Sequence, residues 1–157
     1  LWGVELDMQW LIAEGLTFYG SAAYLNAEYK ETQEQITGVS LDSKLAKTPE
    51  WTATAALEYR TMVLNGEGLL RVDYSYTDES FADVRNTPQL RQKAHSLVNA
   101  RAAWTTPNET FTIAAYGKNI FNERFVLNGF DVSIATGSVL AIPNQPRELG
   151  VQGIVRF

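Results

Sequence analysis

The final stretch of the chain, QPRELGVQGIVRF at residues 145–157, alternates between two kinds of side chain. Counted back from the last residue, every second position is apolar or small and the others are mostly polar, with Ile154 as the exception. The apolar or small positions are Leu149, Val151, Gly153, Val155 and Phe157. Because successive side chains of a strand point to opposite faces, this pattern predicts a strand with one apolar and one polar face. We interpret it as the closing strand of a barrel.

Six further segments show the same two-residue period, whereas helical periodicity is poor. They are residues 2–12, 16–29, 50–62, 69–78, 95–105 and 110–120. The short turns between them are 13–15, 64–68 (with Asn65-Gly66 as a hairpin signal) and 106–109. The long connections are 30–48, which is polar and expected to lack regular structure, 79–94, which is also polar, and 121–145, which is the longest. This alternation is typical of outer-membrane barrels, which have short periplasmic turns and long outer loops. We therefore predict an all-β, antiparallel, up-and-down transmembrane barrel segment of seven strands, with its C-terminus on the periplasmic side.

Aromatic residues occur at both ends of the apolar face. Trp2 and Trp10 are eight residues apart, as are Trp51 and Tyr59. At about 3.4 Å per residue this is roughly 27 Å, and a tilt of about 40° reduces it to roughly 21 Å of depth, near the roughly 25 Å of an apolar membrane band. We interpret the aromatics as interfacial girdles, the alternative being a general preference of aromatics for strands. Further members are Trp104, Phe111 and Phe157 on the periplasmic side and Tyr24 and Tyr76 on the outer side.

The polar face carries many charges, which a dry core could not accommodate. They are Glu5, Asp7, Glu58, Arg60, Arg71, Asp73, Arg101, Lys118 and Arg156. We expect these side chains to face a wet or plugged lumen; an open sheet facing bulk solvent is the alternative. Glu58, Arg60, Arg71 and Asp73 flank one hairpin and could form an ionic ladder, whose pairing depends on a register that the pattern does not define.

The composition bounds the function. The 157 residues correspond to one domain, and 45% hydrophobic with 20% charged residues excludes a disordered chain. A net charge of −5 argues against a nucleic-acid partner. Cysteine is absent, which excludes disulfides and thiolate metal sites. No run approaches the roughly 18 apolar residues of a membrane-spanning helix. Because the chain opens on Leu1 without a signal-peptide pattern, we expect it to be a fragment of a longer protein or a mature protein cut far from its start.

Signals for catalysis or metal binding are weak. The single histidine, His95, lies where the second long connection meets a strand, with no triad motif around it, so we expect a loop or interface residue and no enzyme. Asp78, Glu79 and Asp83 could touch a divalent cation but are more typical of a solvated loop, and we predict no metal and no cofactor. Aromatic and charged residues of the long connections are candidates for contacting a ligand from outside, with ordinary loop packing as the alternative. They are Phe81, Arg85, Arg91, Lys93, Phe130 and Asp131.

Several short motifs, in their order and spacing along nearly the whole chain, resemble those of TonB-dependent outer-membrane receptors. YGKNIFNERF at residues 116–125 resembles the family's "xNLFDxxY"-like stretch that leads from the penultimate strand into the last outer loop, with Ile120, Asn122 and Phe125 in place of Leu, Asp and Tyr. PRELGV at 146–151 resembles the "PRxxGV" entry to the last strand. GVEL at 3–6, LT and GS within 16–21, YLNAEY at 24–29 and PEWT at 49–52 continue the match. Phe157, with Val151 and Val155 on its face, resembles the signal that the outer-membrane assembly machinery recognises.

The resemblance implies a 22-stranded barrel that holds an N-terminal plug and is driven by the TonB–ExbB–ExbD complex in the bacterial outer membrane. Residues 1–157 would be the C-terminal portion of the barrel domain, without the plug. The family imports scarce nutrients, such as ferric siderophores, haem, cobalamin or glycans, so the implied partners are the plug, the TonB complex, the assembly machinery, outer-membrane lipid and a small-molecule nutrient. The rival readings are an outer-membrane enzyme barrel of the lipase or protease type, a passive porin and a soluble β-sheet binding module.

Overall fold

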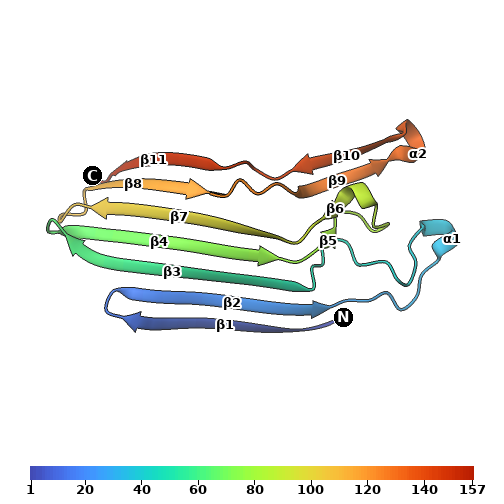
Figure 1. The fold of residues 1–157 in the computed structure, drawn as a ribbon, viewed down its shortest axis with the longest axis horizontal. Coiled ribbons are helices and arrows are strands. Elements are labelled where there is room, and N and C mark those ends of the chain that lie inside the picture. The colour runs from blue at the N-terminus through green and yellow to red at the C-terminus, as the bar shows by residue number, and fades with distance from the viewer.

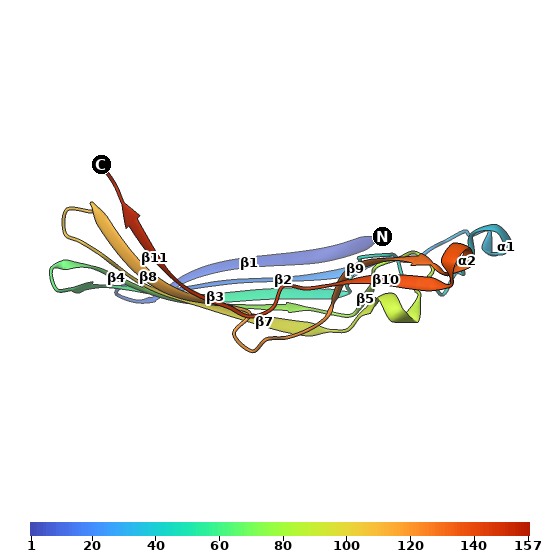
Figure 2. The same ribbon diagram turned by 90° about the horizontal axis from the view of Figure 1, so that it is seen from above.

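Seven long antiparallel strands form one sheet in the computed structural model, which describes residues 1–157. In sheet order they are β1 (Trp2–Ala13), β2 (Leu16–Asn26), β3 (Trp51–Val63), β4 (Gly66–Thr77), β7 (His95–Thr105), β8 (Phe111–Lys118) and β11 (Glu148–Val155). Figure 1 shows them side by side, and Figure 2 shows that the sheet is curved. Strands β1 and β11 are the two edges, so the barrel is not closed within these residues. The prediction of seven antiparallel strands is confirmed.

The two ends of the sheet differ as predicted (Figure 1). Short turns and the C-terminus lie at one end, and the long connections and the N-terminus lie at the other. Residues 30–48 are not structureless, which corrects the prediction, and all three long connections contain short elements. They contain α1 (Glu34–Thr37), β5 (Ser80–Phe81), η1 (Pro88–Leu90), β6 (Arg91–Gln92), β9 (Val126–Val132), α2 (Ser133–Thr136) and β10 (Ser138–Pro143). The β9–β10 hairpin was missed because Asn128, Gly129 and Asp131 interrupt its apolar pattern with residues typical of turns. No helix of the protein is long and apolar enough to cross a membrane.

The register brings the apolar positions of all seven strands onto one face. Val4 lies opposite Tyr24, and Tyr24 opposite Trp51. At the loop end of this face the Tyr24 ring contacts the rings of Trp2 and Trp51, with centroids 5.4 and 4.8 Å away. The face is not covered by other parts of the chain, because only 13 of 157 residues are buried and four of these are hydrophobic. Exposed apolar side chains on it include Leu6, Leu57, Leu70, Val72 and Val151.

The hairpin between β3 and β4 turns one residue earlier than its Asn-Gly signal suggested. Leu64 and Asn65 both have positive φ, 52° and 63°, and Val63 pairs with Gly66, which defines a two-residue turn of type I′. Gly66 is the first residue of β4, where a Cβ would lie 2.2 Å from the Thr105 carbonyl oxygen and 2.8 Å from Nε1 of Trp104. The Trp104 indole donates a 2.8 Å hydrogen bond to the Val63 carbonyl. The glycine therefore makes room for an indole that ties β7 to this hairpin.

A glycine under an aromatic ring joins the closing strand to its neighbour. Gly150 of β11 pairs with Tyr116 of β8, and a Cβ on Gly150 would lie 2.5 Å from the Tyr116 ring. The Tyr116 hydroxyl continues past the glycine and donates a 2.8 Å hydrogen bond to Glu148. A ring that covers a cross-strand glycine helps to define register. The Gly of the PRELGV motif thus has a packing role.

We predict that Gly150→Ala lowers the stability of the β8–β11 pair, because the new methyl group displaces the Tyr116 ring and its hydrogen bond to Glu148. Overpacking of this kind costs about 1–3 kcal/mol. The measurement is the unfolding temperature of the full-length protein in outer membranes, followed by its heat-modified mobility on gels. Gly153→Ala on the same strand is the matched control, because a Cβ there meets only the Phe111 ring at 3.9 Å. Equal unfolding temperatures for the two variants would contradict the packing role.

Candidate functional site

The first two long connections are joined by a reciprocal pair of hydrogen bonds. The Lys44 backbone N–H donates to Oδ1 of Asn86 at 2.6 Å, and Nδ2 of Asn86 donates to the Lys44 carbonyl at 2.9 Å. Nearby, the Lys47 N–H donates to the Phe81 carbonyl at 2.8 Å. Asn86 adopts a positive φ of 55°, which asparagine tolerates better than most residues. One side chain therefore holds loop 27–50 against loop 78–94.

The β9–β10 hairpin of the third connection packs on the second. Leu90 at the end of η1 is completely buried, and its Cδ2 occupies the space beside Gly129 where a Cβ would lie 2.3 Å away. The Thr87 hydroxyl lies between Asp83, 2.7 Å away, and Asp131 of β9, 3.3 Å away. All three outer loops are thus connected, and Figure 1 shows them together beyond the loop ends of the strands.

Two buried asparagines close the base of the third loop. Asn119 donates from Nδ2 to the carbonyls of Glu123 and Gln145 at 3.0 and 3.1 Å and accepts the Glu123 N–H at 2.8 Å. Asn144 accepts the Phe125 N–H at 3.1 Å and donates to the Glu123 carbonyl at 2.9 Å. Asn119 is the first of the two asparagines of the YGKNIFNERF motif, and its hydrogen bonds join the two ends of the connection between the last two strands of the sheet.

A groove between the first two loops is the best candidate for ligand binding. Its volume is about 950 Å³, within the range of small-molecule sites. Its lining includes an aromatic ring, Tyr29, two cationic side chains, Lys30 and Arg85, and one carboxylate, Glu31. Arg85 is exposed and lies near Gly38 of the first loop. A half-buried aromatic ring with one more cation than carboxylates suits an anionic, partly aromatic ligand.

The structure separates the six residues expected to contact a ligand. Only Arg85 lies in the groove. Tyr29 was missed because the alternation placed the end of its strand three residues too late, at 29 instead of Asn26. Lys30 is the first residue of the predicted connection, and nothing in the pattern distinguishes it from the other charged residues there. Arg91 forms an ion pair with Glu79, which raises the pKa of its guanidinium further above the ordinary value.

The other four lie elsewhere in the loops. Hydrogen bonds from Ser133, and less strongly from Thr87, lower the pKa of the Asp131 carboxyl below its ordinary value, so it stays ionised at neutral pH. Phe130 is exposed on the opposite face of the same hairpin. Phe81 is half-buried on β5, and the Lys93 carbonyl lies 3.0 Å from Nδ1 of His95.

His95 has a structural environment. Its imidazole is buried and stacks on the Phe125 ring at a centroid distance of 3.6 Å, and its Nδ1 lies at the Lys93 carbonyl. The three acidic residues of the second loop are held separately: Glu79 by Arg91, Asp83 by Thr87, and Asp78 by the Glu79 backbone. No group of three or more metal-ligating side chains lies together in the chain.

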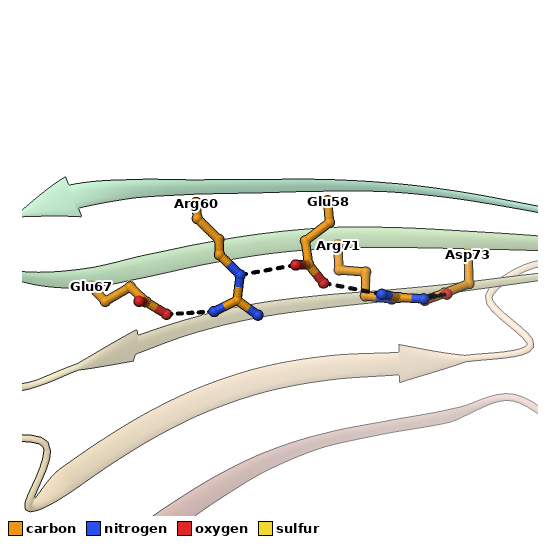
Figure 3. A network of polar contacts seen from close by, with 5 residues as sticks. All are labelled: Glu58, Arg60, Glu67, Arg71 and Asp73. Atoms are coloured by element: carbon orange, nitrogen blue, oxygen red, sulfur yellow. Dashed lines mark hydrogen bonds and ion pairs between the residues drawn. The ribbon is translucent and has the colours of Figure 1, made fainter. Parts of the chain in front are cut away.

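The polar face of the sheet carries an ion-pair network along the β3–β4 hairpin (Figure 3). Glu58 lies directly opposite Arg71, and their side chains are 3.0 Å apart. Arg60 bonds Glu58 at 2.9 Å and Glu67 at 2.7 Å, and Arg71 bonds Asp73 at 2.7 Å. The ladder that the sequence suggested is therefore present, with its pairing set by the register.

The remaining charges of the polar face are more sparsely paired. Lys118 of β8 reaches Glu148 of β11 at 3.4 Å. Arg101 of β7 lies opposite Arg71, and its hydrogen-bond partner is the uncharged side chain of Gln152, at 3.1 Å. Glu5 and Asp7 lie on the edge strand β1 and are exposed.

Comparison with solved structures shows the fold to which this sheet belongs. The ferric yersiniabactin uptake receptor FyuA from Yersinia pestis superposes with a TM-score of 0.84 at 21% identity, over 99% of this chain and 23% of that chain. The ferric preacinetobactin receptor BauA and the siderophore receptor PiuA, both from Acinetobacter baumannii, superpose with TM-scores of 0.74 and 0.73 at 18% and 19% identity. Each of these two matches covers 96% of this chain and 21% of the other. The chain thus spans less than a quarter of the length of the structures it matches.

A family model extends the comparison to sequence. The model described as TonB dependent receptor-like, beta-barrel, matches residues 1–120. These residues include the first six strands of the sheet and the first two outer loops. The chain therefore belongs to the TonB-dependent receptor-like β-barrel family, as its motifs predicted.

Proposed function

We propose that residues 1–157 form the C-terminal part of the barrel domain of an outer-membrane receptor that imports ferric siderophores with energy from TonB. The observation that carries the proposal is the uncovered apolar face of the sheet, which has aromatic residues at both ends. A contiguous apolar surface of this extent is unfavourable in water and favourable in lipid. The family to which the chain belongs supplies the TonB dependence and the uptake class.

The orientation follows from the two ends of the sheet. The short-turn end, with the C-terminus, faces the periplasm, and the three connected loops face outward. The polar face lines the lumen, where the Glu58–Arg71 network has access to water or to a plug domain. Proposed partners are therefore the plug, the TonB–ExbB–ExbD complex, the barrel assembly machinery and outer-membrane lipid.

Two observations support ferric siderophores as the substrate class. The three matched structures are a ferric yersiniabactin uptake receptor, a ferric preacinetobactin receptor and a siderophore receptor. The groove between the first two loops carries Lys30, Arg85 and Tyr29 with a single carboxylate, Glu31, and this net positive lining suits an anionic ferric chelate. Binding at the loops and plug is followed by a TonB-driven rearrangement of the plug that admits the chelate. The chain acts as wall and recognition surface, and we assign it no enzymatic step.

We predict TonB-dependent iron uptake by the full-length protein. Cells that express it as their sole siderophore receptor should accumulate radiolabelled ferric siderophore, and deletion of tonB should reduce uptake to background. Screening siderophores of different chelating groups identifies the substrate. Uptake that persists without TonB, or diffusion of small sugars through the protein in liposomes, would instead support a passive porin.

We predict that charge reversal in the groove, K30E with R85E, weakens siderophore binding at least tenfold, equivalent to about 1.4 kcal/mol. The measurement is equilibrium binding of the labelled ferric chelate to whole cells at 4 °C. The matched control is K47E with R124E, which makes the same change of charge at two exposed loop residues outside the groove. Equal loss of affinity in both variants would show a general surface-charge effect and not a site in the groove.

A further inference from the structure

Two arginines on the polar face lack a carboxylate partner, although every other basic residue on that face has one. Arg60 and Arg71 are bonded to the acids of their own hairpin, and Lys118 is bonded to Glu148. Arg101 instead bonds the Gln152 amide oxygen, and Arg156 bonds the Glu109 backbone carbonyl at 3.4 Å. The register contributes to this imbalance, because it places Arg101 opposite Arg71, a like charge.

The two unpaired guanidinium groups are directed to the same region. Arg101 belongs to β7, yet its Nη2 reaches across β8 to Gln152 of β11. Gln152 and Ile154 of β11 and Arg156, directly after the strand, are spaced by two and share the polar face. Arg101, bonded to Gln152, and Arg156 therefore lie on the two sides of Ile154.

A cavity of about 440 Å³ joins these residues near the short-turn end of the sheet. Its lining includes Arg101, Arg156, Ile154, Arg60 and Glu67. Glu67 is already bonded to Arg60 at 2.7 Å, so it does not neutralise the other two arginines. Ile154 is the apolar exception to the alternation of the last strand, and here it lies half-buried between two cations.

We propose that Arg101 and Arg156 form a docking site for a carboxylate side chain of the plug, with an adjacent apolar plug side chain packed on Ile154. This inference rests on the proposed function, because it requires a domain that fills the lumen. Charge complementarity selects the partner: a charge removed from water needs an opposite charge, and the sheet supplies carboxylates to its other cations but not to these. Lipid is excluded as the occupant because the cavity is on the face opposite the apolar surface.

The test is zero-length crosslinking of the full-length protein in outer membranes. A carbodiimide joins an amine to a carboxylate in direct contact, whereas the guanidinium of arginine does not react. R101K and R156K each place an amine at the proposed contact with the plug carboxylate, which can then be crosslinked. We expect each variant to yield a crosslinked peptide between position 101 or 156 and an Asp or Glu of the plug, at least tenfold above the unsubstituted protein. Mass spectrometry identifies both ends.

Two internal controls make the outcome decisive. Lys118 and Glu148 are already in contact and should crosslink in every sample, which shows that the reagent reaches the polar face. R71K should crosslink to Glu58 or Asp73 within the sheet. If the amines introduced at 101 and 156 gave no product, or linked only to carboxylates of residues 1–157, while both controls reacted, the docking site would be refuted.

The experiments distinguish an error in the proposed docking site from an error in the proposed function. Uptake that does not require TonB would overturn the function while leaving a crosslink between barrel and plug intact. Conversely, TonB-dependent uptake with no crosslink at either position would support the proposed function and refute the docking site.

Discussion

The hydrogen-bond register between strands is the constraint on which the rest of this structure depends. Of 88 backbone hydrogen bonds, 70 lie within helices and strands, whereas only four hydrophobic residues are buried. The sheet is therefore held by its ladder and not by an apolar core. Because side chains alternate with a period of two, a slip of one residue would exchange the two faces of a strand. Every pairing in the sheet preserves the same division between an apolar and a charged face.

The outer loops are organised by a different kind of interaction. Side-chain amides there bond backbone groups, as Asn86 does between two loops and as Asn119 and Asn144 do at the base of the third. Leu90, at the contact between η1 and the β9–β10 hairpin, is the one large side chain that is fully buried. Such contacts satisfy buried backbone groups that a loop cannot pair by itself. The ties between Asn86 and Lys44 and between Lys47 and Phe81 hold the two loops that form the groove together, which reduces the entropic cost of ordering these loops when a ligand binds.

Some charged side chains of the polar face are bonded to a side chain of opposite charge, and others are not. Along β3 and β4 the acids and bases alternate, and each is bonded to a neighbour, so this part of the wall is electrostatically complete. Near β7 and β11 the arginines exceed the acids that contact them. Incomplete pairing at one place on an otherwise paired surface is the pattern expected where a separate domain supplies the missing charges.

The sequence by itself determined the features that depend on local alternation. It identified seven strands, the assignment of residues to two faces, the alternation of short and long connections and the family. The strands and their two faces are predictable because the direction of a side chain along a strand depends only on its parity, whereas the family was identified from the order and spacing of short motifs. Tertiary structure decided which residues meet across strands. Examples are the Glu58–Arg71 pair, the like charges of Arg101 and Arg71 and the position of Tyr116 over Gly150. It also decided that Arg85 reaches the groove while Arg91 and Asp131 are bonded within the loops. Such contacts join residues far apart in the chain, and their geometry follows from register and loop packing, which single-strand periodicity does not encode.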